Sequence, residues 1–180
     1  EALAVLDQGA ALSNAPPGFL VDLAGFHIAA ARQRLVPQEL IKPRALALLD
    51  RAARLNPTEP VVRERMAEGY RALGEVRRAT AWYEQLLNDN PPEDRRQRLL
   101  LREQLFQLYV RAGDPASAGR QLEAITQDDP ANPRVYALLG ALAVEEKKFA
   151  DAERHYEKAL LLNPDLEPAY YDLAGVKLGL

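Results

Sequence analysis

The sequence has no cysteine and only one methionine, one tryptophan and two histidines among its 180 residues. Without cysteine, the chain can form no disulfide and can offer no thiolate as a nucleophile or metal ligand. His27 and His155 form no i, i+4 pair, so zinc and metalloprotease signatures lack their ligands. Glycine-rich phosphate loops and the GxSxG nucleophile elbow are also absent. We therefore predict a protein that is not an enzyme, with no catalytic residues, no cofactor and no bound metal.

Neither sign of charge dominates, and long apolar runs are lacking. The 23 Lys and Arg against 26 Asp and Glu give a net charge of −3, which argues against nucleic acid or an anionic membrane as the main target. No charge-free apolar run is long enough to span a bilayer, so we expect no membrane insertion. One arginine-rich segment contains interspersed acids and is expected to be a solvated helix face rather than a phosphate contact; its arginines are Arg95, Arg96, Arg98 and Arg102.

The most informative stretch runs from Pro133 to Pro164 and predicts two amphipathic helices joined by a short turn. At 3.6 residues per turn, the apolar residues of each half fall on one stripe, and the two stripes face each other. Small residues, Gly140, Ala152 and Ala159, let the two backbones approach, while aromatic and leucine side chains fill the remaining volume. A proline ends the second helix. One such pair cannot bury both faces, so we expect neighbouring pairs.

The spacing of these residues resembles the tetratricopeptide repeat, a helix–turn–helix unit of about 34 residues. Two further stretches, Pro60 to Pro91 and Leu99 to Pro130, carry equivalent small, aromatic and proline residues in frame. The resemblance implies an all-α protein, an α-solenoid in which antiparallel helix pairs stack into a right-handed superhelix. The high alanine content and the excess of arginine over lysine are typical of a bacterial protein, and the composition fits either the cytoplasm or the periplasm.

We expect residues 1–180 to form a single array. Its predicted parts are the second helix of a truncated repeat (1–17), a degenerate repeat with an insertion (18–59), three repeats (60–91, 99–130 and 133–164) and the first helix of a further repeat (167–180). The chain begins without methionine, and we expect it to be a fragment cut within a repeat at both ends. In the degenerate repeat, the excess residues between Pro37 and Pro43 predict either an extended first helix or a loop with a short turn. Gly74 is expected to end a helix in the left-handed conformation, and a further helix is expected to begin near Glu93.

The inner positions of each first helix lie opposite the packed stripe and would line the concave wall on which such arrays bind partners. The predicted partner-binding groove consists of Arg65, Arg71, Gln104, Gln107, Arg111, Arg134, Leu138, Ala141, Val144 and Tyr171. Chaperone-binding members of the family hold a peptide C-terminal carboxylate with lysine and asparagine, but the corresponding positions here carry Glu64, Glu68, Glu103 and Gln107. The asparagine ladder of the O-linked glycosyltransferase array is missing too. His27 falls where a buried aromatic is expected, so we interpret it as a satisfied core histidine.

We favour the hypothesis that the chain is a protein–protein interaction scaffold that binds a peptide or helix of another protein in this groove. Leu138, Ala141, Val144 and Tyr171 would form an apolar floor, with Arg111 and Arg134 beside it for an acidic group. Two alternatives remain open. The array could be a spacer or regulatory arm of a larger multidomain or exported assembly protein, or it could self-associate through uncapped end helices.

Overall fold

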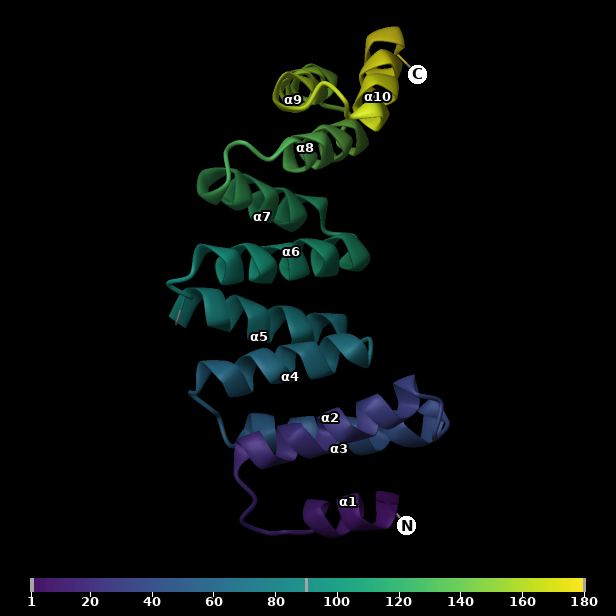
Figure 1. The fold of residues 1–180 in the computed structure, drawn as a ribbon, viewed down its shortest axis with the longest axis vertical. Helices are drawn as coiled ribbons and strands as arrows, with labels where there is room; N and C mark the ends of the chain where they lie inside the picture. The colour runs from purple at the N-terminus through teal and green to yellow at the C-terminus, as the bar shows by residue number, and fades with distance from the viewer. Residues whose placement is uncertain (1, 90, 180) are drawn as a thin grey trace. The chain divides into compact units, whose positions relative to one another are not determined.

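The computed structural model describes residues 2–89 and 91–179, with side chains from Ala4 onward (Figure 1). Glu1, Asn90 and Leu180, which fall within predicted segments, lie outside the described residues. The described part contains ten α-helices and no strand. The chain divides into two compact units, Glu1–Pro91 and Pro92–Leu180, which are described separately.

Unit 1 is built from two antiparallel helix pairs preceded by a short helix (Figure 1). Its helices are α1 (Ala2–Ala10), α2 (Pro17–Arg32), α3 (Gln38–Arg54), α4 (Pro60–Ala72) and α5 (Val76–Asp89). Helix α2 packs along α3, and α4 packs along α5. Helix α2 also contacts α4, while α1 packs on α2. The first helices of successive pairs, α2 and α4, therefore lie next to each other.

Unit 2 also contains two antiparallel helix pairs and ends in a single helix. Its helices are α6 (Arg95–Ala112), α7 (Pro115–Asp128), α8 (Pro133–Glu145), α9 (Phe149–Leu162) and α10 (Glu167–Leu178). Helix α6 packs along α7 and α8 along α9, while α7 contacts α8 and α9 contacts α10. In unit 2 the second helix of each pair, α7 or α9, thus contacts both its own partner and the helix that follows it, whereas in unit 1 the first helices α2 and α4 are in contact.

The predicted packing of small residues between helices is confirmed. Ala152 and Ala159 are fully buried, and a Cβ added at Gly140 would lie 2.9 Å from two ring carbons of Tyr156. The equivalent alanines of the other pairs, Ala79 and Ala118, are also fully buried. Because the backbone of α8 lies directly on an aromatic ring of α9, this contact leaves no room for a side chain at residue 140.

Left-handed residues end several first helices. Gly74 has φ +79° and Gly113 has φ +70°, which confirms the predicted role of Gly74. In the pair α8–α9 the same place in the turn is taken by Lys147, with φ 60°. A lysine adopts this conformation at a steric cost that glycine avoids.

The prediction for the insertion after α2 was wrong. Helix α2 ends at Arg32, and the excess residues extend the second helix instead, because α3 begins at Gln38 and continues through Pro43. Proline removes one helical hydrogen bond and its ring crowds the carbonyl four residues earlier. Burial offsets this cost, since Ile41, in the extra turn, is fully buried.

The beginnings of three first helices share a contact to a preceding backbone carbonyl. In each, the fourth residue of the helix donates a hydrogen bond to the backbone carbonyl six residues earlier: Arg63 to Pro57, Arg98 to Pro92 and Tyr136 to Pro130. Both arginines also pair with an aspartate at the end of the following helix, Arg63 with Asp89 and Arg98 with Asp128. The fourth residue of α2 is Leu20, which has no side-chain donor.

Candidate partner-binding site

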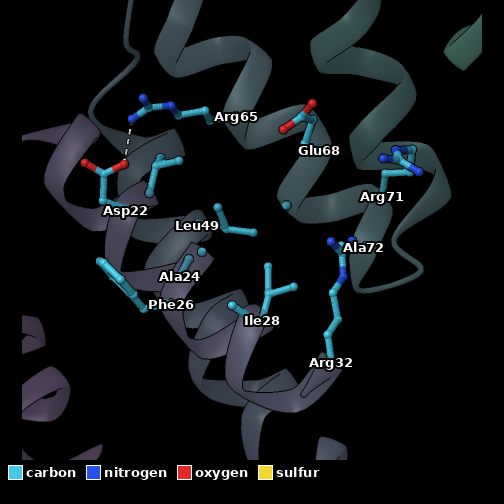
Figure 2. Close-up of a pocket in the computed structure, with 14 residues that line it drawn as sticks. Asp22, Ala24, Phe26, Ile28, Arg32, Leu49, Arg65, Glu68, Arg71 and Ala72 are labelled. Carbon is cyan, nitrogen blue, oxygen red and sulfur yellow. Dashed lines mark hydrogen bonds and ion pairs between the residues drawn. The ribbon is translucent and has the colours of Figure 1, made fainter. Parts of the chain in front are cut away.

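A pocket of about 660 Å³ lies between α2 and α4 in unit 1 (Figure 2). Its lining residues lie between Val21 and Arg32 on α2 and between Arg65 and Ala72 on α4, and Leu49 of α3 completes the lining. At 1.5 Å per residue, this stretch of α2 is about 16 Å long, the length of about five residues of extended chain. The pocket can therefore hold a short segment of another protein.

The middle of the pocket is apolar. Ala24, Ile28 and Leu49 form its floor, and Gly25 and Ala29 keep it unobstructed. A Cβ added at Gly25 would meet nothing within 4 Å, so the space above this residue is open. Phe26 adds a ring that is 65% exposed, so its apolar surface is available to a ligand. These side chains suit an apolar group of a partner.

Charged side chains occupy the two ends of the pocket. Arg65 and Asp22 form an ion pair of 2.6 Å at one end, and Figure 2 shows Arg32 and Arg71 toward the other end. Glu68 lies on the rim between the two arginines of α4. Because Asp22 neutralises Arg65, the local charge balance leaves two guanidinium groups against one carboxylate.

Arg71 contacts Tyr83, a residue of α5. Its guanidinium hydrogen-bonds to the hydroxyl of Tyr83, a residue that is 1% exposed. Burial raises the pKa of Tyr83, and the contact with Arg71 partly opposes that shift. The Nε of Arg71 is buried and has no hydrogen-bond partner among the described residues. Arg71 is therefore a partly fixed cation with unused donor capacity.

Two of the predicted groove residues, Arg65 and Arg71, line this pocket. The α2 wall was missed because the degenerate repeat was left out of the predicted site. Applying the same inner positions to α2 selects six residues, and all of them except Gly18 line the pocket: Gly18, Val21, Asp22, Gly25, Ile28 and Ala29. The signal was therefore present in the helical spacing. Phe26 and Arg32 lie outside those positions, and only the structure identifies them.

The other eight predicted residues belong to unit 2, on three first helices. Helix α6 carries Gln104, Gln107 and Arg111; helix α8 carries Arg134, Leu138, Ala141 and Val144; helix α10 carries Tyr171. Most are exposed, with Tyr171 76% and Leu138 40% accessible. Val144 instead packs against the buried cluster of Ala143, Ala152, Tyr156 and Ala169. The Oε1 atom of Gln104 is buried as well.

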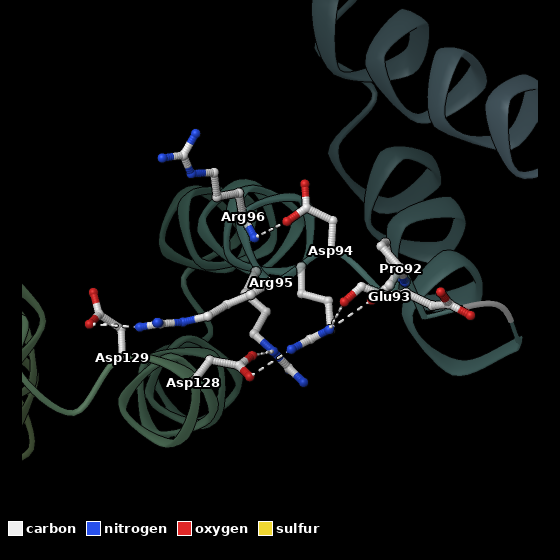
Figure 3. Close-up of polar contacts among 9 residues, drawn as sticks. Pro92, Glu93, Asp94, Arg95, Arg96, Asp128 and Asp129 are labelled. Atoms are coloured by element: carbon white, nitrogen blue, oxygen red, sulfur yellow. Dashed lines mark hydrogen bonds and ion pairs between the residues drawn. The ribbon is translucent and has the colours of Figure 1, made fainter.

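The arginine-rich start of α6 forms ion pairs within unit 2 (Figure 3). Arg95 pairs with Asp129, and both Arg98 and Arg102 pair with Asp128. Arg98 also donates to the carbonyls of Pro92 and Glu93. Helix α6 starts at Arg95, two residues later than expected, because the side chain of Asp94 caps it by accepting from the Arg96 amide. These arginines fasten α6 to α7, which explains their spacing without a phosphate ligand.

His27 is buried, as predicted, with 1% of its surface exposed. Neither ring nitrogen has a hydrogen-bond partner among the described residues, so the expectation of a satisfied histidine was wrong. Burial lowers the pKa of His27; nearby Asp7 raises it and Arg44 lowers it further. The histidine is therefore held in its neutral form.

The described residues carry neither a metal-binding cluster nor a helix that could span a membrane. They contain no group of three or more histidines and carboxylates arranged to hold a metal ion. In the same part of the chain, every helix is too short or too polar to cross a bilayer.

Comparison with solved structures places this architecture among known helical repeats. MamA from Desulfovibrio magneticus RS-1 aligns with a TM-score of 0.60 and 19% identity over 88% of this chain and 84% of its own. MamA AMB-1 aligns with a TM-score of 0.63 and 21% identity over 91% and 82%. The first TPR of Spaghetti (RPAP3), bound to the HSP90 peptide SRMEEVD, aligns with a TM-score of 0.53 and 19% identity over 67% and 91%. No curated protein matches the sequence.

The fold therefore defines an all-α helical repeat protein, built from antiparallel helix pairs. The family profile "Tetratricopeptide repeat" matches residues 133–166, the pair α8–α9 and the turn after it. The pair α8–α9 therefore matches the tetratricopeptide repeat, in agreement with the resemblance seen in the sequence, and the rest of the chain shares the fold of the solved repeat structures.

Proposed function

We propose that this protein is an interaction scaffold that binds a short segment of another protein in the pocket between α2 and α4. The observation that carries the proposal is an open cavity with an apolar floor and charged ends, on neighbouring first helices. Helix pairs of this kind present such walls to partners. The similar fold of RPAP3, which is bound to a peptide, supports a peptide ligand.

The test needs binders, which can be selected from a phage-displayed library of random linear peptides against the whole chain. Selected peptides are then measured by fluorescence anisotropy against two variants. Gly25→Trp fills the pocket without disturbing the core, because nothing lies within 4 Å of a Cβ at this residue. Ala81→Trp places the same ring on an exposed residue of α5 outside the pocket.

We expect Gly25→Trp to weaken binding by at least about tenfold, because the indole excludes the partner from the apolar floor. Ala81→Trp should bind as tightly as the unmodified protein. If no peptide is selected, or if every selected peptide binds Gly25→Trp normally, the pocket is not the partner site.

Unit 2 offers a second surface, on the exposed faces of α8 and α10. We propose that Leu138, Ala141 and Tyr171 contact an apolar part of a partner and that Arg134 contacts an acidic group; Val144 is left out because it packs into the core. Peptides that bind here should be insensitive to Gly25→Trp and lost with the pair Leu138→Asp and Arg134→Glu. Binding that survives both sets of changes would contradict both surfaces.

A further inference from the structure

The pocket between α2 and α4 carries information about the chemistry of its partner, on the condition that it is the partner site proposed above. We propose that it recognises a segment in which an apolar side chain lies within a few residues of an aspartate or glutamate, with the apolar group on the floor and the carboxylate between Arg32 and Arg71. The inference rests on the charges at the two ends of the pocket.

At the end of the pocket formed by Asp22 and Arg65, the two charges already neutralise each other. Their ion pair of 2.6 Å joins α2 to α4, so neither side chain needs a charged partner. The opposite end differs, because Arg32 has no ion pair or hydrogen bond among the described residues, and Arg71 bonds to the Tyr83 hydroxyl rather than to a carboxylate. A carboxylate placed there would meet two guanidinium groups from two different helices.

Arg71 has the features of a preformed binding group. Tyr83 fixes its position, and its buried Nε has a donor with no acceptor within the described part of the chain. Because part of the guanidinium is already held, a carboxylate that meets its remaining N–H groups loses less side-chain freedom on binding than it would at a fully solvated arginine. Glu68 on the same rim disfavours a partner with several adjacent acids and so favours a single, well-placed carboxylate.

The spacing along the pocket sets the separation of the two groups. Asp22 and Arg32 are ten residues apart on α2, about 15 Å along the helix axis. The apolar floor at Ile28 and Leu49 lies between these charged ends. A partner side chain on the floor thus lies within a few residues of the arginine end.

The carboxylate is assigned to a side chain rather than to a chain terminus. Arg32 is exposed in the last turn of α2 and no contact encloses it, so a segment can continue past it toward solvent. A C-terminal carboxylate would need an enclosed pocket lined by several hydrogen-bond donors.

The experiment uses the peptides selected on the whole chain that lose binding with Gly25→Trp. Each is remade in two forms, one with its aspartates and glutamates changed to asparagine and glutamine, and one with an amidated C-terminus. Binding is measured to the unmodified protein and to Arg32→Gln, Arg71→Gln and the control Arg77→Gln, an exposed arginine of α5.

We expect the neutral peptides to bind about tenfold more weakly and the amidated peptides to bind unchanged. Arg32→Gln and Arg71→Gln should each weaken the acidic peptides by about five- to tenfold, and Arg77→Gln should have no effect. Peptides with lysine in place of the acid should prefer Arg32→Glu to the unmodified protein, which a merely structural role of Arg32 would not produce.

Two results would overturn the inference while leaving the pocket as the partner site: sensitivity to Gly25→Trp with no dependence on acidic residues, or binding that requires a free C-terminus. Peptides insensitive to Gly25→Trp would instead reject the proposed site itself. Because Arg32 is exposed, Arg32→Gln tests the charge without endangering the fold, even if Arg71→Gln loosens the contact with Tyr83.

Discussion

Replacing Gly140 with alanine tests the helix-to-helix contact on which the fold of unit 2 depends. The added Cβ would lie 2.9 Å from Cε1 and Cζ of Tyr156 and 3.0 Å from its Cδ1. Carbon atoms prefer separations of about 3.5 to 4.0 Å, and the ring of Tyr156 is 2% exposed, so it cannot simply turn away. Helix α8 must therefore move off α9.

The size of the effect follows from two opposing contributions. Alanine is favoured over glycine within a helix by about 1 kcal/mol, whereas overpacking costs about 1 to 3 kcal/mol. The matched control Gly175→Ala gains the same propensity on α10, where a Cβ meets nothing within 4 Å. The difference between the two variants isolates the overlap, and we expect Gly140→Ala to be less stable than Gly175→Ala by about 1 to 3 kcal/mol.

The measurement is urea unfolding of the whole chain followed by far-UV circular dichroism, with hydrogen exchange of the α8 and α9 amides to locate the loss. Changing Tyr156 to leucine removes the ring, so the cost of Gly140→Ala should shrink by at least about 1 kcal/mol in that background. If Gly140→Ala stabilises the protein as much as Gly175→Ala does, the close contact between the two helices is wrong.

Three further predictions concern unit 1. Arg63→Met should cost about 2 to 3 kcal/mol, because it leaves the Pro57 carbonyl without its buried donor, whereas Arg77→Met on an exposed face should cost less than about 0.5 kcal/mol; equal losses in urea unfolding would refute this. Pro43→Ala should stabilise by about 1 to 3 kcal/mol, since it restores a hydrogen bond within α3; a lower melting temperature would mean that the helix is interrupted there. Because burial lowers the pKa of His27, the unfolded chain binds the extra proton, so stability is full above about pH 6.5 and declines below it. Fluorescence of the single tryptophan, which lies in α5, should show that His27→Tyr flattens this decline; an unchanged pH profile would exclude His27 as its source.

The sequence predicted the parts of the fold that depend on repeating contacts. Gly140, Ala152 and Gly74 were assigned correctly because each meets a local requirement, close packing or a left-handed turn, that few residue types satisfy. The start of α3 was predicted wrongly because a proline such as Pro43 is expected to mark a helix boundary. The helix continues through it because Ile41, which precedes the proline, is fully buried, a tertiary contact that local propensity does not reveal.

The candidate site was predicted only in part, for a related reason. Helical spacing identified Arg65 and Arg71, but the unusual length of the repeat containing α2 hid the opposite wall. The pairing of Arg98 with Asp128 depends on which helices are neighbours, which charge patterning alone does not reveal. Predictions of self-association and of a spacer role stay predictions; light scattering and expression of any longer parent chain would test them.

The arginine at the start of α4 has a consequence for how the two walls of the pocket are positioned. Arg63 anchors α4 both to the preceding connection and to Asp89, so this wall has little freedom to shift. At the equivalent place α2 has Leu20, which can donate to neither. The start of α4 is thus held by polar side-chain bonds and the start of α2 by apolar packing, since Leu20 is fully buried, so the two walls of the pocket are positioned by different kinds of contact.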